Sequence, residues 1–96
     1  MALFTVRVEM HDADSEDYTL LHEVMGSYGY RRYIIGTTSN DQVGLWKLPS
    51  AEYTTEKAMT AVQVRDEIMT IANTIHPAPW CLATQVQDCA WSTEKI

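Results

Sequence analysis

Basic side chains are scarce in this sequence. Lysine and arginine together number 7 against 13 aspartates and glutamates, which gives a formal net charge of −6 at pH 7. Proteins that hold nucleic acid through its phosphates usually present a positive surface. The charge balance therefore argues against general nucleic-acid binding and leaves room only for a local basic patch.

Long apolar runs and a signal-peptide pattern are also lacking. No stretch is long enough to cross a bilayer, and no basic residue precedes the apolar N-terminal run. We therefore expect a cytoplasmic protein that does not enter a membrane. A chain of 96 residues indicates a single domain over residues 1–96 with a modest core. Residues 89–96 form a short tail that can fray.

Only two cysteines are present, Cys81 and Cys89. On one extended strand they would lie roughly 26 Å apart, whereas a disulfide requires Cα atoms within about 7 Å. Reduced thiols are the simpler interpretation. The sequence holds no Gly-rich phosphate loop, nucleophile elbow or zinc motif, so we expect no cofactor.

Residues 2–10 carry the clearest pattern in the chain. Apolar side chains alternate with mixed ones, Phe4, Val6, Val8 and Met10 against Leu3, Thr5, Arg7 and Glu9. This period of two predicts a strand with one buried face, and we expect it at the centre of a sheet.

The later segments predict two helices and three more strands. We expect helix 15–28 capped by Asp14 or Ser15 and ended by Gly29, strand 30–35, connection 36–42, strand 43–56 broken at Pro49, helix 61–75 capped by Thr60 and Gln63, and strand 80–88. This order is the split βαβ, or ferredoxin-like, pattern: a four-stranded antiparallel sheet with both helices on one face. The other face would be bare, which favours a homodimer through the sheet or by strand-edge pairing.

His11, Asp12 and Asp14 follow the first strand. They are candidates for a metal or general acid–base site at a strand end, and the pKa of a histidine suits proton transfer. A turn and a helix cap already account for both aspartates. The role of His11 is left open by that alternative.

Arginine is concentrated on the predicted strands, at Arg7, Arg31 and Arg32. If Arg7 and one of the pair share the bare face, their guanidinium groups could hold a phosphate. Alternatively they pair across strands with Glu9, Glu52 and Glu56. The alternation does not settle which face of strand 30–35 is which.

The aromatic side chains and His22 allow two interpretations. Trp46, Trp80 and Trp91, with Tyr30 and Tyr33, could stack on splayed RNA bases, although such residues more often fill a core or an interface. His22 lies on the first predicted helix, where we expect a surface or boundary residue.

Three segments of the chain resemble the GhoS-type small proteins: FTVRVEMHDADSEDYTLLHEVM at 4–25, the Gly29–Tyr30 step, and LPSAEY at 48–53. These are described as Cas2-like, ferredoxin-fold endoribonuclease antitoxins of type V toxin–antitoxin systems. The resemblance covers most of residues 2–88 and implies sequence-selective cleavage of the messenger of a small membrane toxin. Metal-independent RNA cleavage needs a base and a cation, for which Arg7, Arg31 or Arg32 and His11 are the candidates. The alternative is a non-catalytic dimeric binding or scaffold protein.

Overall fold

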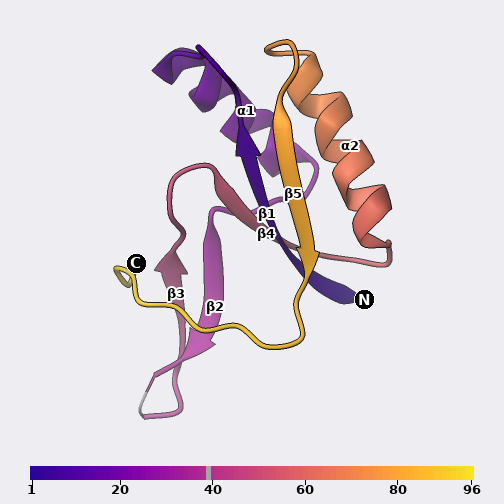
Figure 1. Cartoon of the computed structure of the whole chain (residues 1–96). Coiled ribbons are helices and arrows are strands. Elements are labelled where there is room, and N and C mark those ends of the chain that lie inside the picture. Colours follow the sequence, from indigo (N-terminus) through magenta and orange to yellow (C-terminus); the bar gives the residue numbers. More distant parts are fainter. Residues whose placement is uncertain (39) are drawn as a thin grey trace.

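The computed structural model describes residues 1–38 and 40–96. In chain order the elements are β1 (Ala2–Glu9), α1 (Ser15–Ser27), β2 (Tyr33–Thr37), β3 (Val43–Lys47), β4 (Glu52–Lys57), α2 (Ala61–Asn73) and β5 (Trp80–Gln85) (Figure 1). Ser39, within the predicted connection 36–42, lies outside the described residues.

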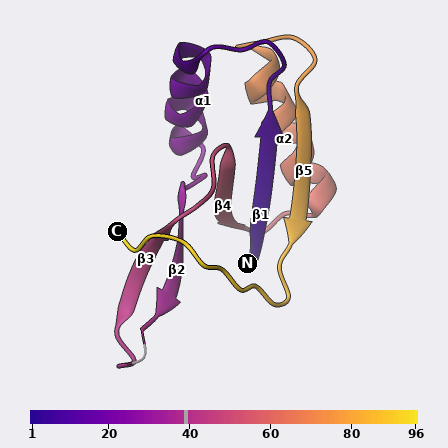
Figure 2. The same ribbon diagram turned by 60° about the vertical axis from the view of Figure 1, so that its left-hand side comes forward.

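β1 lies at the centre of a three-stranded antiparallel sheet of order β4-β1-β5, as its alternation predicts. Phe4, Val6, Val8 and Met10 are buried, and both helices pack on that face of the sheet (Figures 1 and 2). α1 contributes Leu21 and Met25 to the core, and α2 contributes Val64, Ile68, Ile71 and Ala72. The apolar periodicities of strand and helices thus meet in one core.

A single four-stranded sheet does not form. β2 and β3 make a separate two-stranded sheet, which is joined to β4 by the bridge between Arg31 and Thr54 and by a hydrogen bond from the Thr54 hydroxyl to the Tyr33 carbonyl. The break comes at Pro49, whose carbonyl accepts a hydrogen bond from the Glu52 N–H at 3.2 Å, and Ala51 within this turn has φ 62°. Proline cannot donate to a strand ladder, so the predicted strand 43–56 divides into β3 and β4.

The C-terminal tail is hydrogen-bonded to β3. The Lys47 N–H donates to the Glu94 carbonyl at 2.9 Å, and the Ile96 N–H donates to Leu45 at 2.8 Å. The tail also passes the helix-free face of the sheet, where residues 89–93 line a hollow together with Thr5 and Glu52. That face is therefore partly covered and not wholly bare, contrary to expectation.

Both helices begin with a capping box, which the sequence predicts at Thr60 and Gln63, whereas at Asp14 it predicts only a cap. Asp14 and Asp17 exchange side chain-to-backbone hydrogen bonds at the start of α1, and Thr60 and Gln63 do so at the start of α2. Gly29 has φ 86° and follows the first helix, as expected. No helix among residues 1–38 and 40–96 is long and apolar enough to span a membrane.

Candidate functional site: a cleft between α1 and the turn before β4

A hollow of about 490 Å³ lies between α1 and the turn that precedes β4. Its walls are formed by Ser15, Tyr18, Thr19 and His22 of α1, by Arg32, and by Ser50 and Ala51 of the turn. The turn is held against the sheet at this point, since the Val8 N–H donates to the Ala51 carbonyl at 3.0 Å. The hollow brings together a histidine and an arginine from segments that are not neighbours in the sequence.

The imidazole of His22 is hydrogen-bonded to the hydroxyl of Tyr53, a residue of β4. Its Nδ1 lies 2.5 Å from the Tyr53 Oη, and the ring centroids are 5.6 Å apart. Tyr53 is fully buried and belongs to the core, so it offers a fixed point to the imidazole. Nε2 has no protein partner among the described residues, and it is not buried. Nδ1 is thus held by Tyr53, whereas Nε2 is accessible to a ligand in the cleft.

The surroundings keep His22 uncharged near neutral pH. Burial lowers the pKa of His22 below its ordinary 6.5, and the guanidinium of Arg32 lowers it further. Burial raises the pKa of Tyr53 well above its ordinary 10.0, so its phenol keeps its proton. If Nδ1 carries the hydrogen and donates it to the Tyr53 Oη, Nε2 has a free lone pair and is a competent proton acceptor; if the Tyr53 hydroxyl donates to Nδ1, the hydrogen lies on Nε2 instead.

Tyr18 fixes α1, and with it His22, against the end of β1. Its hydroxyl accepts a hydrogen bond from the Met10 N–H at 2.9 Å and donates to the Met10 carbonyl at 3.2 Å. Because Tyr18 and His22 are one helical turn apart, this contact sets the position of the histidine.

The three sequence-predicted arginines do not gather at one place. Arg32 lines the cleft, whereas Arg31 faces the helix-free side of the sheet, where its Nη2 lies 4.0 Å from a Glu56 carboxylate oxygen. Arg7 lies on that same side, opposite Glu52 on β4. Arg7 and Arg31 thus share the helix-free side, with β4 between them and an offset of two residues along the strands, and each has a glutamate of β4 beside or opposite it.

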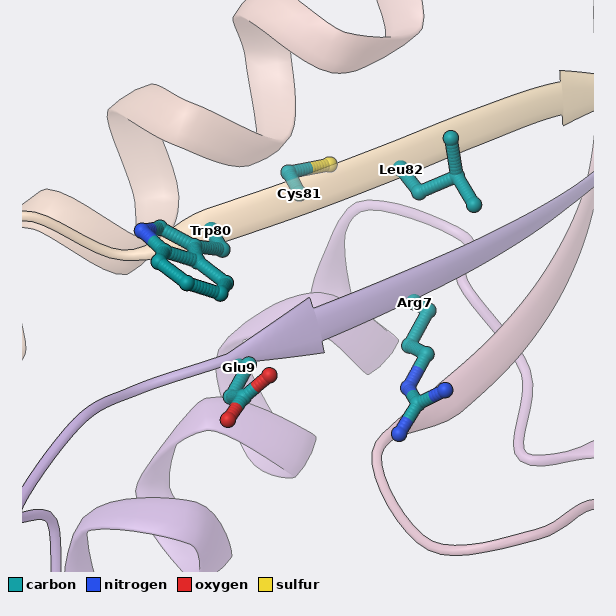
Figure 3. A pocket seen from close by; sticks show the side chains of 5 residues that line it. All are labelled: Arg7, Glu9, Trp80, Cys81 and Leu82. Atoms are coloured by element: carbon teal, nitrogen blue, oxygen red, sulfur yellow. The ribbon is translucent and has the colours of Figure 1, made fainter.

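Arg7 lines a shallow hollow of about 310 Å³ with Glu9, Trp80, Cys81 and Leu82. In Figure 3 its guanidinium points away from Trp80 and Leu82. Burial raises the pKa of the Cys81 thiol to about 11, so Cys81 is a poor nucleophile. Cys81 and Cys89 are both free thiols.

His11 does not line the cleft with Arg32, but it contacts Glu9 and Trp80, which line the hollow beside Arg7. Its ring packs edge-on against Trp80 at 4.3 Å between centroids, and its Nδ1 is 3.9 Å from a Glu9 oxygen. Asp14 caps α1 and Asp12 occupies the preceding turn with φ 58°. Among the residues described, no three His, Cys, Asp or Glu side chains gather in a way that could hold a metal ion.

Sequence reasoning missed the role of His22 and Tyr53. No local signal marks them, since they are 31 residues apart and lie on different elements. The available clue was the position of His22 one turn after Tyr18 on an amphipathic helix, which places both at the edge of the buried stripe.

Comparison of the chain with protein-family models, with curated proteins and with solved structures finds no match in any of the three. The class of protein that the structure itself defines is a small α+β protein of two helices and antiparallel strands, with an imidazole and a guanidinium in one cleft.

Proposed function

We propose that the protein is a GhoS-like endoribonuclease that cleaves single-stranded RNA without a metal ion, using the cleft between α1 and the turn before β4. The observation that carries the proposal is that His22, held neutral, and the cation of Arg32 line the same cleft. These are the two groups that metal-independent transfer of a phosphodiester requires.

The chemistry assigns each group one task. With its hydrogen on Nδ1, His22 donates to Tyr53 and its Nε2 takes the proton of a ribose 2′-hydroxyl. The 2′-oxygen then attacks the adjacent phosphorus, the bond from phosphorus to the 5′-oxygen breaks, and the leaving oxygen takes a proton from water. Arg32 stabilises the charge on the phosphorane. The products are a 2′,3′-cyclic phosphate and a 5′-hydroxyl end.

The fold is compatible with this family assignment. In a ferredoxin-like sheet the second strand lies beside the third on its outer edge, and here Arg31 bridges to Thr54 at the outer edge of β4. The resemblance of residues 4–25 to GhoS-type proteins adds the substrate: the messenger of a small membrane toxin, met in the cytoplasm. The site differs from the sequence-based hypothesis, because His22 takes the place of His11 as the base.

A non-catalytic binding protein is the second candidate, and one observation favours it. Arg31 lies near Glu56, and Arg7 is opposite Glu52 across the strand pair. The helix-free face is thus close to charge balance, which suits an interface better than a phosphate track. This alternative leaves the cleft without a role.

Cleavage of a random-sequence pool of single-stranded RNA, in buffer containing EDTA, distinguishes the two candidates. The proteins are the wild type, His22→Gln and Arg32→Ala, with Arg31→Ala as the matched control because it removes the same charge one residue away. We expect the first two variants to lose cleavage by about 10²-fold or more, and Arg31→Ala to retain it. A circular-dichroism melt of each variant confirms folding.

The cleavage products and the comparison of the four proteins either support or overturn the proposal. Cyclic-phosphate ends that disappear with His22→Gln and Arg32→Ala support the proposal, as does resistance of a fully 2′-deoxy strand. No cleavage by folded wild-type protein, or equal cleavage by all four proteins, overturns it and leaves the binding protein as the surviving candidate.

A further inference from the structure

β5 is an edge strand, and no strand among residues 1–38 and 40–96 lies on its outer side. The Val86 N–H donates to the Leu3 carbonyl at 2.8 Å, which fixes the alternation of the β1–β5 pairing. Even-numbered residues of β5 therefore direct their backbone groups to β1. Cys81, Ala83 and Gln85 direct theirs outward, where the sheet ends.

The outer edges of β4 and β3, unlike that of β5, form backbone hydrogen bonds with other segments of the chain. The outer edge of β4 bonds with Arg31, and that of β3 bonds with the tail at residues 94–96. Natural edge strands are commonly protected by a charge, a proline or a bulge. β5 has none of these, and it exposes two large apolar side chains, Trp80 at 65% and Leu82 at 66%.

We infer that the edge of β5 pairs antiparallel with β5 of a second copy, about a two-fold axis at Ala83. This register sets Cys81 opposite Gln85 of the second copy and Ala83 opposite itself. Every outward N–H of the three residues then meets a carbonyl, which is the self-complementarity that a two-fold interface needs. The small side chain of Ala83 lets the two strands approach on the side covered by α2.

The absence of charge on β5 makes it an edge where two copies can meet with little electrostatic repulsion. The chain carries a net charge of −6, so two copies repel each other wherever acidic surfaces meet. β5 has no charged residue, and on its helix-free face Leu82 would lie opposite Thr84 of the second copy. The pairing joins two sheets into one and shields the exposed leucine and tryptophan.

The inference does not depend on the proposed nuclease activity. The cleft lies between α1 and the turn before β4, and β4 and β5 are at opposite edges of the three-stranded sheet. Both clefts therefore stay open in the dimer.

Sedimentation equilibrium over a range of concentrations tests the interface. Ala83→Pro removes an outward N–H without removing a bond to β1, and Leu82→Lys places like charges at the seam. We expect wild-type dimers, and a dimer dissociation constant raised roughly tenfold or more in either variant. Val43→Lys is the control, because Val43 is 76% exposed on the separate β2–β3 sheet.

Each outcome bears on the inference. A dimer weakened by both β5 variants but not by Val43→Lys supports it, provided that the melting curves show folded monomers. A monomeric wild type at all concentrations overturns it, as does a dimer that only Val43→Lys weakens or that none of the variants weakens. Leu82→Lys protein that is monomeric but still cleaves RNA separates this interface from the catalytic proposal.

Discussion

Arg31 and Arg32 are adjacent in the chain but act on opposite faces of the sheet. Arg31 bridges to Thr54 and lies near Glu56 on the helix-free side, whereas Arg32 lies in the cleft beside His22. A variant that replaces both arginines would therefore mix two unrelated effects. Substituting them one at a time separates a charge in the cleft from a charge beside a carboxylate.

Asp14 is expected to stabilise the protein as a helix cap. Its carboxylate accepts a hydrogen bond from the Asp17 N–H at 2.9 Å. Asp14→Ala should lower the free energy of unfolding by about 1 kcal/mol, and Asp14→Asn, which can still cap, by only a few tenths. Urea denaturation measures both values. Equal losses in the two variants would show that the charge, and not the cap, is what matters.

Gly36 is expected to be needed for the tail to pack. A Cβ at this position would lie 2.5 Å from the Trp91 ring and 3.1 Å from Trp46. Gly36→Ala should displace Trp91 and alter the near-ultraviolet circular dichroism of the tryptophans. Gly26→Ala is the matched control, because its Cβ meets no atom within 4 Å and alanine favours a helix by about 0.5–1 kcal/mol. A Gly36→Ala spectrum identical to wild type would contradict the tail's packing.

Glu67 forms a half-buried cluster with Lys57 and Tyr30. Its Oε1 accepts from the Lys57 Nζ at 2.6 Å and from the Tyr30 hydroxyl at 2.8 Å. Burial alone would raise the pKa of Glu67, but these two hydrogen bonds outweigh it and hold the pKa below the ordinary 4.5.

Acid should therefore destabilise the protein through this cluster. The contribution of Glu67 is fully present above pH 4.5 and is lost as the pH falls through its lowered folded-state pKa. Glu67→Gln should cost roughly 1–2 kcal/mol at pH 7, because Lys57 keeps its charge without a counter-ion while solvent screens part of the pair. The variant should also show a flatter stability profile below pH 4.5. A variant as stable as wild type at pH 7 would rule out the cluster's contribution.

The sequence predicts the elements well because each depends on local chemistry. The cap at Asp14, the capping box at Thr60, the left-handed Gly29 and the break at Pro49 are set by neighbouring residues, and all four are confirmed. Pairing between strands depends on distant residues. The predicted strand 30–35 is an example. In the structure Arg31 forms a single bridge to Thr54, and β2 covers residues 33–37. A short run without clear alternation does not fix the register of a strand.

The candidate site was less predictable for the same reason. Arg32 was identified as a cation from its type, but its face followed only from the register of Arg31 against Thr54. His22 reaches the cleft because Tyr53 holds it across 31 residues. Such a pairing exists only once α1 packs on β4, so no local pattern contains it.

The pH titration of His22 by nitrogen-15 and carbon-13 NMR tests the central claim most directly. The account predicts that His22 titrates below 6.5, that its neutral form carries the hydrogen on Nδ1, and that Arg32→Ala raises its pKa toward 6.5. A His22 that titrates at or above 6.5, carries its hydrogen on Nε2 or is indifferent to Arg32→Ala would contradict it.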